Sequence, residues 1–447
     1  MEKEKKKLNK WFIPLFIVLG LVLLFVLIGF INLFLNLSLR HYIKSYSKVE
    51  YSERIEPVKD ENGYYSFISD SDIKVLELTD IHLGGGFLSY RKDKKTIDDC
   101  ITMIQAEKPD LVILNGDNVF AIPYISGTLN NKMVSKTVVT IFDHLEVYFS
   151  TVFGNHETEV FDYYNRQALG KFYQNNKSKY CLFESNFNEY GVSNQVILTK
   201  RPDGLITKTL LLLDSNSYVD NSIKSVINWD YDVINDSQIK WAKEVIEDLS
   251  NKNKETFNSL SLSDISNLDP EKFIPVKSIF FFHIPISEFE IAYEALYNNN
   301  FNDTENAKYI SGVFGEYNHD DPIYDKICYG GWLKGETLGT QDNFFEELIE
   351  TNSLEMIICG HDHTNNAVVE YEGVVLAYSY SIDNLAYSNI DKSGLQRGCN
   401  ILTIKNNGDI EFNQKNLYLD GYKSEKNTNY DVYLDHYYYD EFVQPQK

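Results

Sequence analysis

Five of the nine histidines in this chain lie in short polar segments that directly follow apolar runs. The segments are Asp80-Ile81-His82, Gly116-Asp117-Asn118, Gly154-Asn155-His156-Glu157, His283-Ile284-Pro285 and Gly360-His361-Asp362-His363. Carboxylate and imidazole groups are the ligands that hard and borderline divalent cations take, and a carboxylate can bridge two ions. The pattern therefore indicates a metal site built from residues of these five segments.

Each segment alone is a weak signal, because an H-x-H pattern has a chance expectation of about 0.2 in a chain of this length and histidine content. Five such segments at the ends of five predicted strands form a strong signal, because ligands of open α/β sheets bind at the carboxyl ends of the strands. The alternative interpretation is a set of polar residues that only cap turns. Glycine precedes Asp117, Asn155 and His361, which favours tight turns and a close approach of the backbone to a metal or phosphate.

Short apolar runs typical of strands alternate with helical patterns along the chain. The expected strands are residues 64–68, 73–79, 111–115, 147–153, 209–213, 278–282, 354–359, 367–371 and 374–378. The expected helices are residues 94–107, 134–144 and 236–249, the last capped by Asp236 or Ser237. Polar or glycine-rich insertions at residues 252–270 and 298–335 are expected to be surface loops. Such alternation predicts an α/β fold.

Composition excludes several classes of protein. The chain has 447 residues, of which 43 % are hydrophobic, so it is not a disordered or collagen-like chain. Its formal net charge of −23 makes a nucleic-acid partner unexpected, because an acidic surface repels a polyanion. The five cysteines are widely spaced and indicate neither a disulfide framework nor a cysteine-ligated metal site.

The amino terminus carries a basic segment, residues 1–10, followed by residues 11–31 without a charge. A helix of that length spans roughly 31 Å, enough to cross a bilayer core. A retained single-pass membrane anchor is therefore expected, and the alternative is a cleaved signal peptide, which has a shorter apolar region. The excess of lysine before the segment favours a cytoplasmic amino terminus and a lumenal or extracellular main domain.

The ordered set D-x-H, G-D, G-N-H-E, H and G-H-x-H resembles the calcineurin-like metallophosphoesterase family over residues 73–404. It is most similar to the branch related to purple acid phosphatases, through Phe281-Phe282-His283-Ile284-Pro285 and the segments 360–365 and 394–400. The resemblance implies a four-layer α/β/β/α sandwich with two metal ions 3 to 4 Å apart.

By this resemblance, the first ion would bind Asp80, His82, Asp117 and His363. The second would bind Asp117, Asn155, His283 and His361, with Asp117 bridging the two. His156 resembles the family histidine that contacts the phosphate and protonates the leaving group. Phe120 stands where purple acid phosphatases carry a tyrosine ligand, so His82 would supply the missing ligand. The ions would be Fe, Zn or Mn.

Composition and the resemblance together divide the chain into the basic segment 1–10, a transmembrane helix at 11–31, a stalk and first strand at 40–72, a metallophosphoesterase domain at 73–415 and an acidic, tyrosine-rich tail at 416–447. The implied function is hydrolysis of phosphate monoesters by a two-metal, metal-hydroxide mechanism. The substrate would be a small molecule or a phosphoprotein. The alternatives are a phosphodiesterase with the same centre and a non-catalytic, membrane-tethered binding protein.

Overall fold

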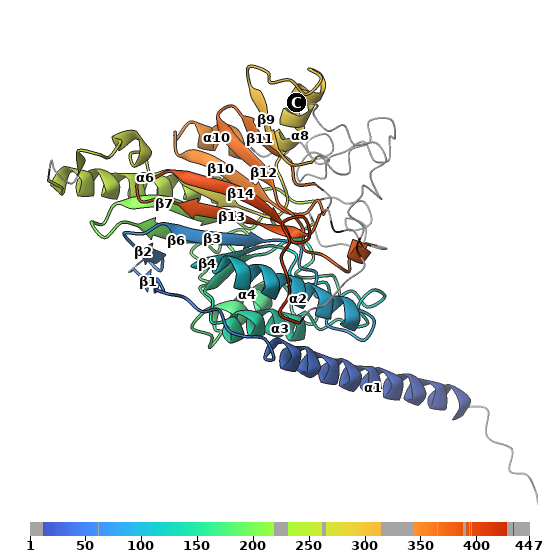
Figure 1. Ribbon diagram of the computed structural model, residues 1–447. Coiled ribbons are helices and arrows are strands. Elements are labelled where there is room, and N and C mark those ends of the chain that lie inside the picture. Colours follow the sequence, from blue (N-terminus) through green and yellow to red (C-terminus); the bar gives the residue numbers. More distant parts are fainter. Residues whose placement is uncertain are drawn as a thin grey trace, which may run out of the picture.

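The computed structural model describes residues 12–60, 62–218, 231–261, 265–313, 343–363, 365–387, 390–392, 394, 396–426 and 432. Two β-sheets lie face to face, and helices cover the outer face of each (Figure 1). The predicted α/β sandwich is confirmed. Both sheets are mixed, with parallel and antiparallel pairs of strands.

The larger sheet has nine strands in the order β1-β2-β6-β7-β8-β10-β12-β11-β9. Their bounds are Val58–Lys59 (β1), Tyr65–Ile68 (β2), Gln195–Lys200 (β6), Ile206–Leu212 (β7), Ser278–Phe281 (β8), Ala307–Ser311 (β9), Leu354–Cys359 (β10), Val368–Tyr371 (β11) and Val374–Tyr378 (β12). The second sheet has the order β14-β13-β3-β4-β5. Its strands are Ile73–Leu78 (β3), Leu111–Asn115 (β4), Phe149–Val152 (β5), Gly398–Ile404 (β13) and Ile410–Asn416 (β14). Strands β7, β8, β10 and β12 run parallel at the centre of the larger sheet, and in the smaller sheet β3, β4 and β5 run parallel while β13 and β14 pair antiparallel at one edge.

Three hydrophobic cores hold these layers together. The core between the sheets joins apolar side chains of β3 and β4 to those of β7, β8 and β10, among them Val75, Ile113, Leu212, Phe281 and Ile358. A second core packs the outer face of the larger sheet against the helices Asp236–Ser259 (α6), Glu288–Tyr297 (α8) and Phe344–Ile349 (α10). The third packs the smaller sheet against Tyr90–Glu107 (α2), Asn131–Leu145 (α3) and Arg166–Gln174 (α4). Burial of this apolar surface is the main force that holds the layers together.

The amino-terminal helix α1 spans Phe12–Ile43 and is therefore longer than the predicted segment 11–31. Its first half projects away from the body of the protein (Figure 1). Its second half packs on α2 and α3, where Leu39 and Ile43 enter the third core. Tyr46 and Val49, in the predicted stalk, are also buried there. Within the described residues, the start of that segment is thus attached to the domain.

Three local predictions were wrong. Helix α6 continues to Ser259, into the predicted loop 252–270, because its buried face extends to Asn253. The cap of α6 is Asn235, whose side chain forms a capping box with Gln238. Strand β9 lies within the predicted loop 298–335, although most of that insertion, residues 314–342, is outside the described residues.

Two short 3-10 helices, Pro270–Lys272 and Ile390–Lys392, complete the described elements. The first strand, predicted at residues 64–68, is β2. The predicted tail begins at Asn416, where β14 ends, and its buried Leu417 belongs to the third core. Most of residues 427–447 are outside the described part of the chain.

Candidate metal centre

The predicted ligands meet at one edge of the molecule, where strands of both sheets end. Asp80 and His82 follow β3, Asp117 follows β4, and Asn155 follows β5 of the smaller sheet. His283 follows β8 and the pair His361 and His363 follows β10 of the larger sheet. The sheets are joined directly here, because Asn115 Nδ2 donates to the carbonyl oxygen of Ile358 at 3.0 Å. Segments almost 300 residues apart therefore share one site.

Two groups of side chains at this edge could each hold a metal ion. One consists of Asp80, His82, Asp117 and His363, and the other of Asp117, His283 and His361. Within each group the potential ligand atoms lie within 4.8 Å of one another, and all the residues are buried. The Asp117 carboxylate belongs to both groups. His283 Nε2 lies 3.0 Å from Asp117 Oδ2, and His363 Nε2 lies 3.2 Å from Asp80 Oδ1.

Apart from these ion pairs, several of the polar atoms form no hydrogen bond among the described residues. They are Asp80 Oδ1, both ring nitrogens of His82, Asp117 Oδ2, both side-chain heteroatoms of Asn155, and His283 Nε2. A buried polar group left without a partner costs about 1–3 kcal/mol. So many in one place are unfavourable unless a cation binds them. The donor set of carboxylate, imidazole and amide oxygen fits two adjacent divalent ions.

The backbone at the centre is strained. Asp80, His82, Asp117 and His361 have φ angles of 53°, 47°, 51° and 74°, which are unusual for residues with a side chain. Such conformations cost about 1–3 kcal/mol each and concentrate at functional sites. We therefore interpret the strain as the cost of directing these four side chains toward a common point.

The glycines before Asp117 and Asn155 leave room for the side chains of other ligands. A Cβ on Gly154 would lie 2.2 Å from Asp117 Oδ1, and one on Gly116 would lie 2.5 Å from the His283 ring. Gly116 also has a φ of 92°. Glycine is required at these positions because the ligand side chains themselves occupy the space.

Opposite charges stabilise one another at the centre. Burial raises the pKa of Asp80, but His363 and His283 outweigh it and lower the pKa to about 2. Burial lowers the pKa of His283, whereas Asp117 and Asp80 raise it to about 9. The pKa of His361 falls to about 3, chiefly through burial and then through His283. Cations bound here would take the place of the imidazolium protons that balance the two carboxylates.

Two of the histidines are oriented by acceptors on their second ring nitrogen. His283 Nδ1 is 2.9 Å from the carbonyl oxygen of Asn115, which leaves Nε2 facing Asp117. His363 Nδ1 is 3.1 Å from Asp383 Oδ2. Such contacts fix the tautomer and direct the ligand nitrogen of a metal-binding histidine. We did not predict Asp383 from the sequence, although it follows β12 in the way that the predicted ligands follow their strands.

Replacing Asp383 with Asn is expected to weaken metal binding about 10- to 100-fold. The Asp383 carboxylate also accepts hydrogen bonds from the amides of Leu385 and Ala386. In the variant, the amide oxygen can accept these two hydrogen bonds only if the NH2 group faces His363 Nδ1. An NH2 group cannot accept a hydrogen bond from that nitrogen. Competition with a fluorescent chelator would measure the change. Unaltered affinity would show that Asp383 does not orient the ligand.

His156 lies beside the predicted ligands rather than among them. Its ring is 5.5 Å from that of His82 and 4.7 Å from that of Phe120, and its Nδ1 is 2.5 Å from Glu159 Oε1. Burial lowers the pKa of His156, but Asp117 and Glu159 raise it above its ordinary value. Phe120, in the position of a tyrosine ligand, packs its ring on both His82 and His156.

Glu157 joins two of the loops that carry the ligands. Its carboxylate accepts hydrogen bonds from the amides of Asp117, Asn118 and Gly154 at 2.7–2.9 Å. It therefore joins the segment after β4 to the segment after β5. Asp117 Oδ1 in turn accepts from the amide of His156 at 2.7 Å, which locks the bridging carboxylate to the same loop.

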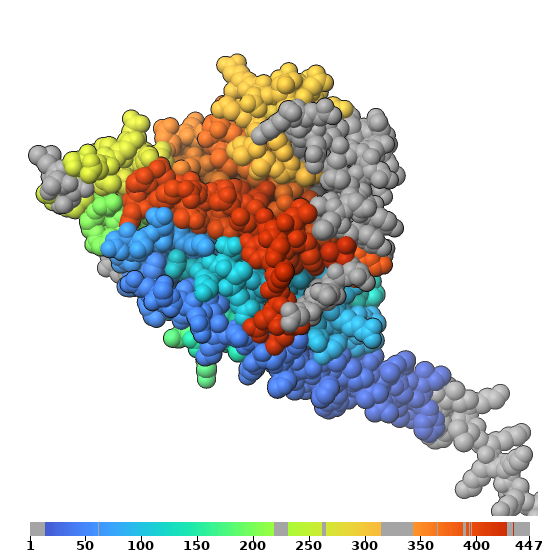
Figure 2. Space-filling model, viewed as in Figure 1, coloured from blue at the N-terminus to red at the C-terminus, as the bar shows by residue number. Residues whose placement is uncertain are grey.

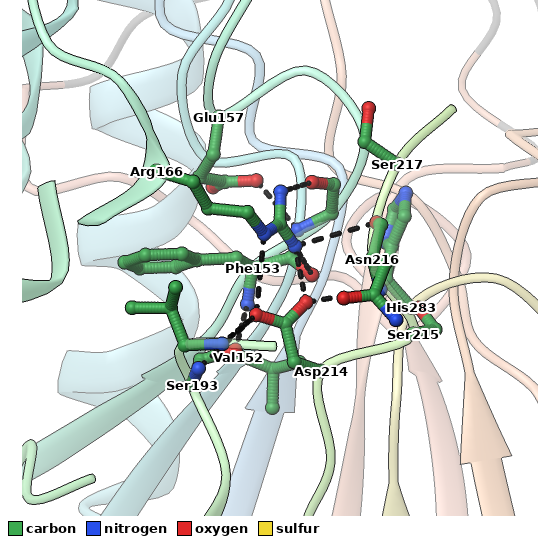
Figure 3. A network of polar contacts seen from close by, with 12 residues as sticks. Val152, Phe153, Glu157, Arg166, Ser193, Asp214, Ser215, Asn216, Ser217 and His283 are labelled. Carbon is green, nitrogen blue, oxygen red and sulfur yellow. Dashed lines mark hydrogen bonds and ion pairs between the residues drawn. The ribbon is translucent and has the colours of Figure 1, made fainter. Parts of the chain in front are cut away.

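A buried ion pair holds this loop from the other side (Figure 3). Arg166 donates to the carbonyl oxygens of Gly154 and Phe153 at 2.8 and 3.1 Å, directly before Asn155. The same guanidinium pairs with Asp214, which follows β7 and also accepts from the amides of Val192 and Ser193. The pair thus fixes the position of Asn155 and His156. Neither residue was predicted from the sequence.

Replacing Asp214 with Asn is expected to lower the free energy of unfolding at pH 7 by about 3 kcal/mol, because Arg166 keeps its charge in a mostly buried site. Burial raises the pKa of Asp214, but Arg166 and the amide donors hold it below the usual 3.8. This stabilisation is present above the pKa of the unfolded carboxyl and is lost as pH falls through the folded pKa. Denaturation of the metal-depleted chains should therefore show a difference in the free energy of unfolding between wild type and variant, and this difference should decrease below about pH 4. A difference that does not change with pH would contradict a stabilising ion pair between Arg166 and Asp214.

Comparison with known proteins agrees with this geometry. The family model described as calcineurin-like phosphoesterase matches residues 73–365, more than half of the chain. The chain is 24 % identical to a protein of Arabidopsis thaliana named probable inactive purple acid phosphatase 14, over 70 % of this chain and 71 % of the relative. It is 23 % identical to probable inactive purple acid phosphatase 29 of the same plant, over 76 % and 78 %.

Two further similarities are more partial. Phosphatase DCR2 of Saccharomyces cerevisiae is 24 % identical over 66 % of this chain, but the match spans only 45 % of the yeast protein. The structure of a dimetal phosphatase from Danio rerio aligns with a TM-score of 0.45 and 12 % identity, over 78 % of this chain and 97 % of that one.

Proposed function

Because the chain belongs to the calcineurin-like phosphoesterase family, we propose that it is an active hydrolase of phosphate monoesters with a dinuclear metal centre. One observation carries the proposal: Asp117 is shared by two adjacent buried clusters, beside which His82 Nδ1 and both side-chain heteroatoms of Asn155 have no hydrogen-bond partner among the described residues. Two relatives are named probable inactive, so the family alone does not imply turnover. What supports activity here is that aspartate, asparagine or histidine fills all seven predicted ligand positions.

Asp80, His82, Asp117 and His363 would hold one ion, and Asp117, Asn155, His283 and His361 the other. When bound, two such ions lower the pKa of a water molecule and neutralise phosphoryl oxygens during in-line attack. The protein fixes the spacing of the pair through the single Asp117 carboxylate. It also supplies a water-poor setting, because all seven side chains are buried.

His156 is proposed to contact the phosphate and to protonate the leaving group. Glu159 occupies Nδ1, which leaves Nε2 as the ring atom that can donate a proton. Burial lowers the pKa of His156, but Asp117 and Glu159 raise it above its ordinary value, which favours the protonated form that a general acid requires. The His156 side chain is also partly exposed, at 18 %, so a substrate can reach it.

Hydrolysis of p-nitrophenyl phosphate and of bis(p-nitrophenyl) phosphate by the full chain in detergent would test the proposal. Faster cleavage of the monoester is expected. Faster cleavage of the diester would favour the phosphodiesterase alternative, since the same centre can cleave either ester. No metal-dependent cleavage of any ester, including phosphoserine peptides, would favour the non-catalytic binding protein. The name of the yeast relative supports a phosphatase without identifying its substrate.

We further propose that α1 anchors the chain in a membrane, with the catalytic domain on the lumenal or extracellular side. The described helix includes a segment, Pro14–Ile43, that is long and apolar enough to cross a bilayer, although a signal sequence has the same properties. Its side chains from Leu15 to Leu27 are exposed, as lipid contact requires. Resistance of the protein to carbonate extraction would support an anchor, and release of a shortened chain would indicate cleavage.

A further inference from the structure

The apolar half of α1 leaves the domain on the side of the metal centre. Three contacts to α2 have the same sequence separation: Ser38 with Tyr90 and Tyr42 with Lys94 from α1, and Tyr46 with Asp98 just past its end. A constant separation means that the two helices run in the same direction. Helix α2 begins just beyond the ligands that follow β3, at the edge that carries the ligands. Because α1 runs parallel to α2, the amino-terminal half of α1 leaves the domain at this same edge.

Asn32 marks the point where the helix departs. Its amide group donates to the carbonyl oxygen of Gly127 at 2.8 Å, and its side-chain oxygen accepts from the amide of Phe87 at 3.0 Å. These partners lie on the loops after β3 and β4, five and ten residues beyond His82 and Asp117. Side chains on the amino-terminal side of Asn32, such as Phe30 and Phe25, are exposed. In Figure 2 this part of α1 extends past the edge of the domain.

Large apolar side chains are exposed on these same two loops and on the loop after β5. We call this surface the rim; it consists of Phe87, Leu88, Tyr124, Val160, Phe161 and Tyr163, of which Tyr124 is 81 % exposed and Phe161 70 %. The loops contact one another, because Leu88 N donates to Ser126 O and Tyr163 N to Leu129 O. Exposed aromatic residues next to an apolar helix are typical of a surface at the membrane interface.

The charges near the rim also suit a bilayer. Arg91 lies in the first turn of α2, and Lys132 and Lys136 lie in the first two turns of α3, although the whole chain is strongly acidic. Both helices begin at the edge from which α1 departs. A basic residue near an anionic lipid surface contributes about 1 kcal/mol to binding.

We propose that the rim docks on the bilayer crossed by α1, and that the metal centre takes a phosphate ester carried by a membrane lipid. This inference rests on the proposed hydrolase and deepens it. Phe87 lies five positions after His82, and Phe161 five positions after His156, so the Cα atoms of each pair lie at most about 18 Å apart. A centre held so close to the headgroup layer faces lipid phosphates at high local concentration.

Tryptophan at the rim provides a direct test in the full chain, reconstituted in phosphatidylcholine vesicles that contain phosphatidic acid. The variants Phe87→Trp and Tyr124→Trp would be compared with Ile68→Trp, an exposed control where β2 ends, on the edge opposite the ligands. Fluorescence of the unsubstituted chain is subtracted from each. Lipids brominated near the headgroup should quench the two rim positions and not the control. Equal quenching at all three positions, or none, would overturn the docking.

Turnover then tests the substrate class. The ratio of phosphatidic acid hydrolysis to p-nitrophenyl phosphate hydrolysis should fall about tenfold in a Phe87→Ser, Tyr124→Ser double variant, because two membrane contacts are lost. An Ile68→Ser variant should keep the ratio of the unsubstituted chain. Hydrolysis of the soluble ester but not of phosphatidic acid would overturn the lipid substrate. Failure to hydrolyse either ester would contradict the proposed hydrolase, while the quenching result would still decide the docking.

Discussion

Replacing Asp117 with Asn is expected to abolish binding of the second metal ion and to reduce turnover on the order of a thousandfold or more. Loss of one electrostatic stabiliser alone costs about 100- to 1,000-fold in rate, and Asp117 belongs to both clusters. A neutral amide oxygen cannot bridge two cations as a carboxylate does. Metal content by mass spectrometry and hydrolysis of p-nitrophenyl phosphate would measure the two effects.

Asp110 offers a matched control at the other end of the same strand. It lies just before β4, where its carboxylate accepts from the amide of Lys74 at 2.8 Å. An Asp110→Asn variant can keep that hydrogen bond and should retain both ions and nearly full activity. Far-UV circular dichroism would verify that both variants fold. If Asp117→Asn kept two ions and full activity, Asp117 would not be the bridging ligand.

Replacing His156 with Ala should lower kcat about 100- to 10,000-fold without loss of metal, because the proton donor is removed. The loop that carries the residue is held independently of the imidazole, by Glu157 and by Arg166. The two ions should therefore stay in place. The loss should be smaller for an ester whose leaving group is a weak base, such as p-nitrophenolate, than for an alkyl phosphate.

This dependence on the leaving group separates a general acid from a structural residue. A disordered loop would slow both esters equally and would release metal. His41→Asn is a suitable control, since His41 is exposed near the end of α1 and away from the centre. Equal loss for both esters would contradict the role of His156 as the acid.

Predictions from the sequence were most accurate where burial dictates the pattern. Strands β4, β10 and β12 have the predicted bounds, because fully buried strands are continuous apolar runs between turns. The candidate ligands were found because each follows such a strand. The same rule applied to β7 and β12 would have indicated Asp214 and Asp383. Neither was predicted, because no histidine lies next to them in the sequence.

Other features depend on contacts that a local pattern does not reveal. Strand β13 pairs with β3 across more than 300 residues, and β14 pairs with β13, so this part of the sheet was not evident from a local pattern. The second half of α1 was expected to lead into a free stalk, yet it packs on α2 and α3. Arg166 was not predicted, because a guanidinium that binds the Phe153 and Gly154 carbonyls leaves no signal in the sequence.

Stepwise addition of metal to the metal-depleted full chain, with p-nitrophenyl phosphate hydrolysis followed at each step, tests the central claim most directly. Zn, Mn and Fe would each be titrated. The shared Asp117 predicts that activity rises with added metal and reaches a plateau at about two ions per chain. A folded chain that binds no metal, or one whose hydrolysis is the same before and after metal removal, would contradict the dinuclear centre.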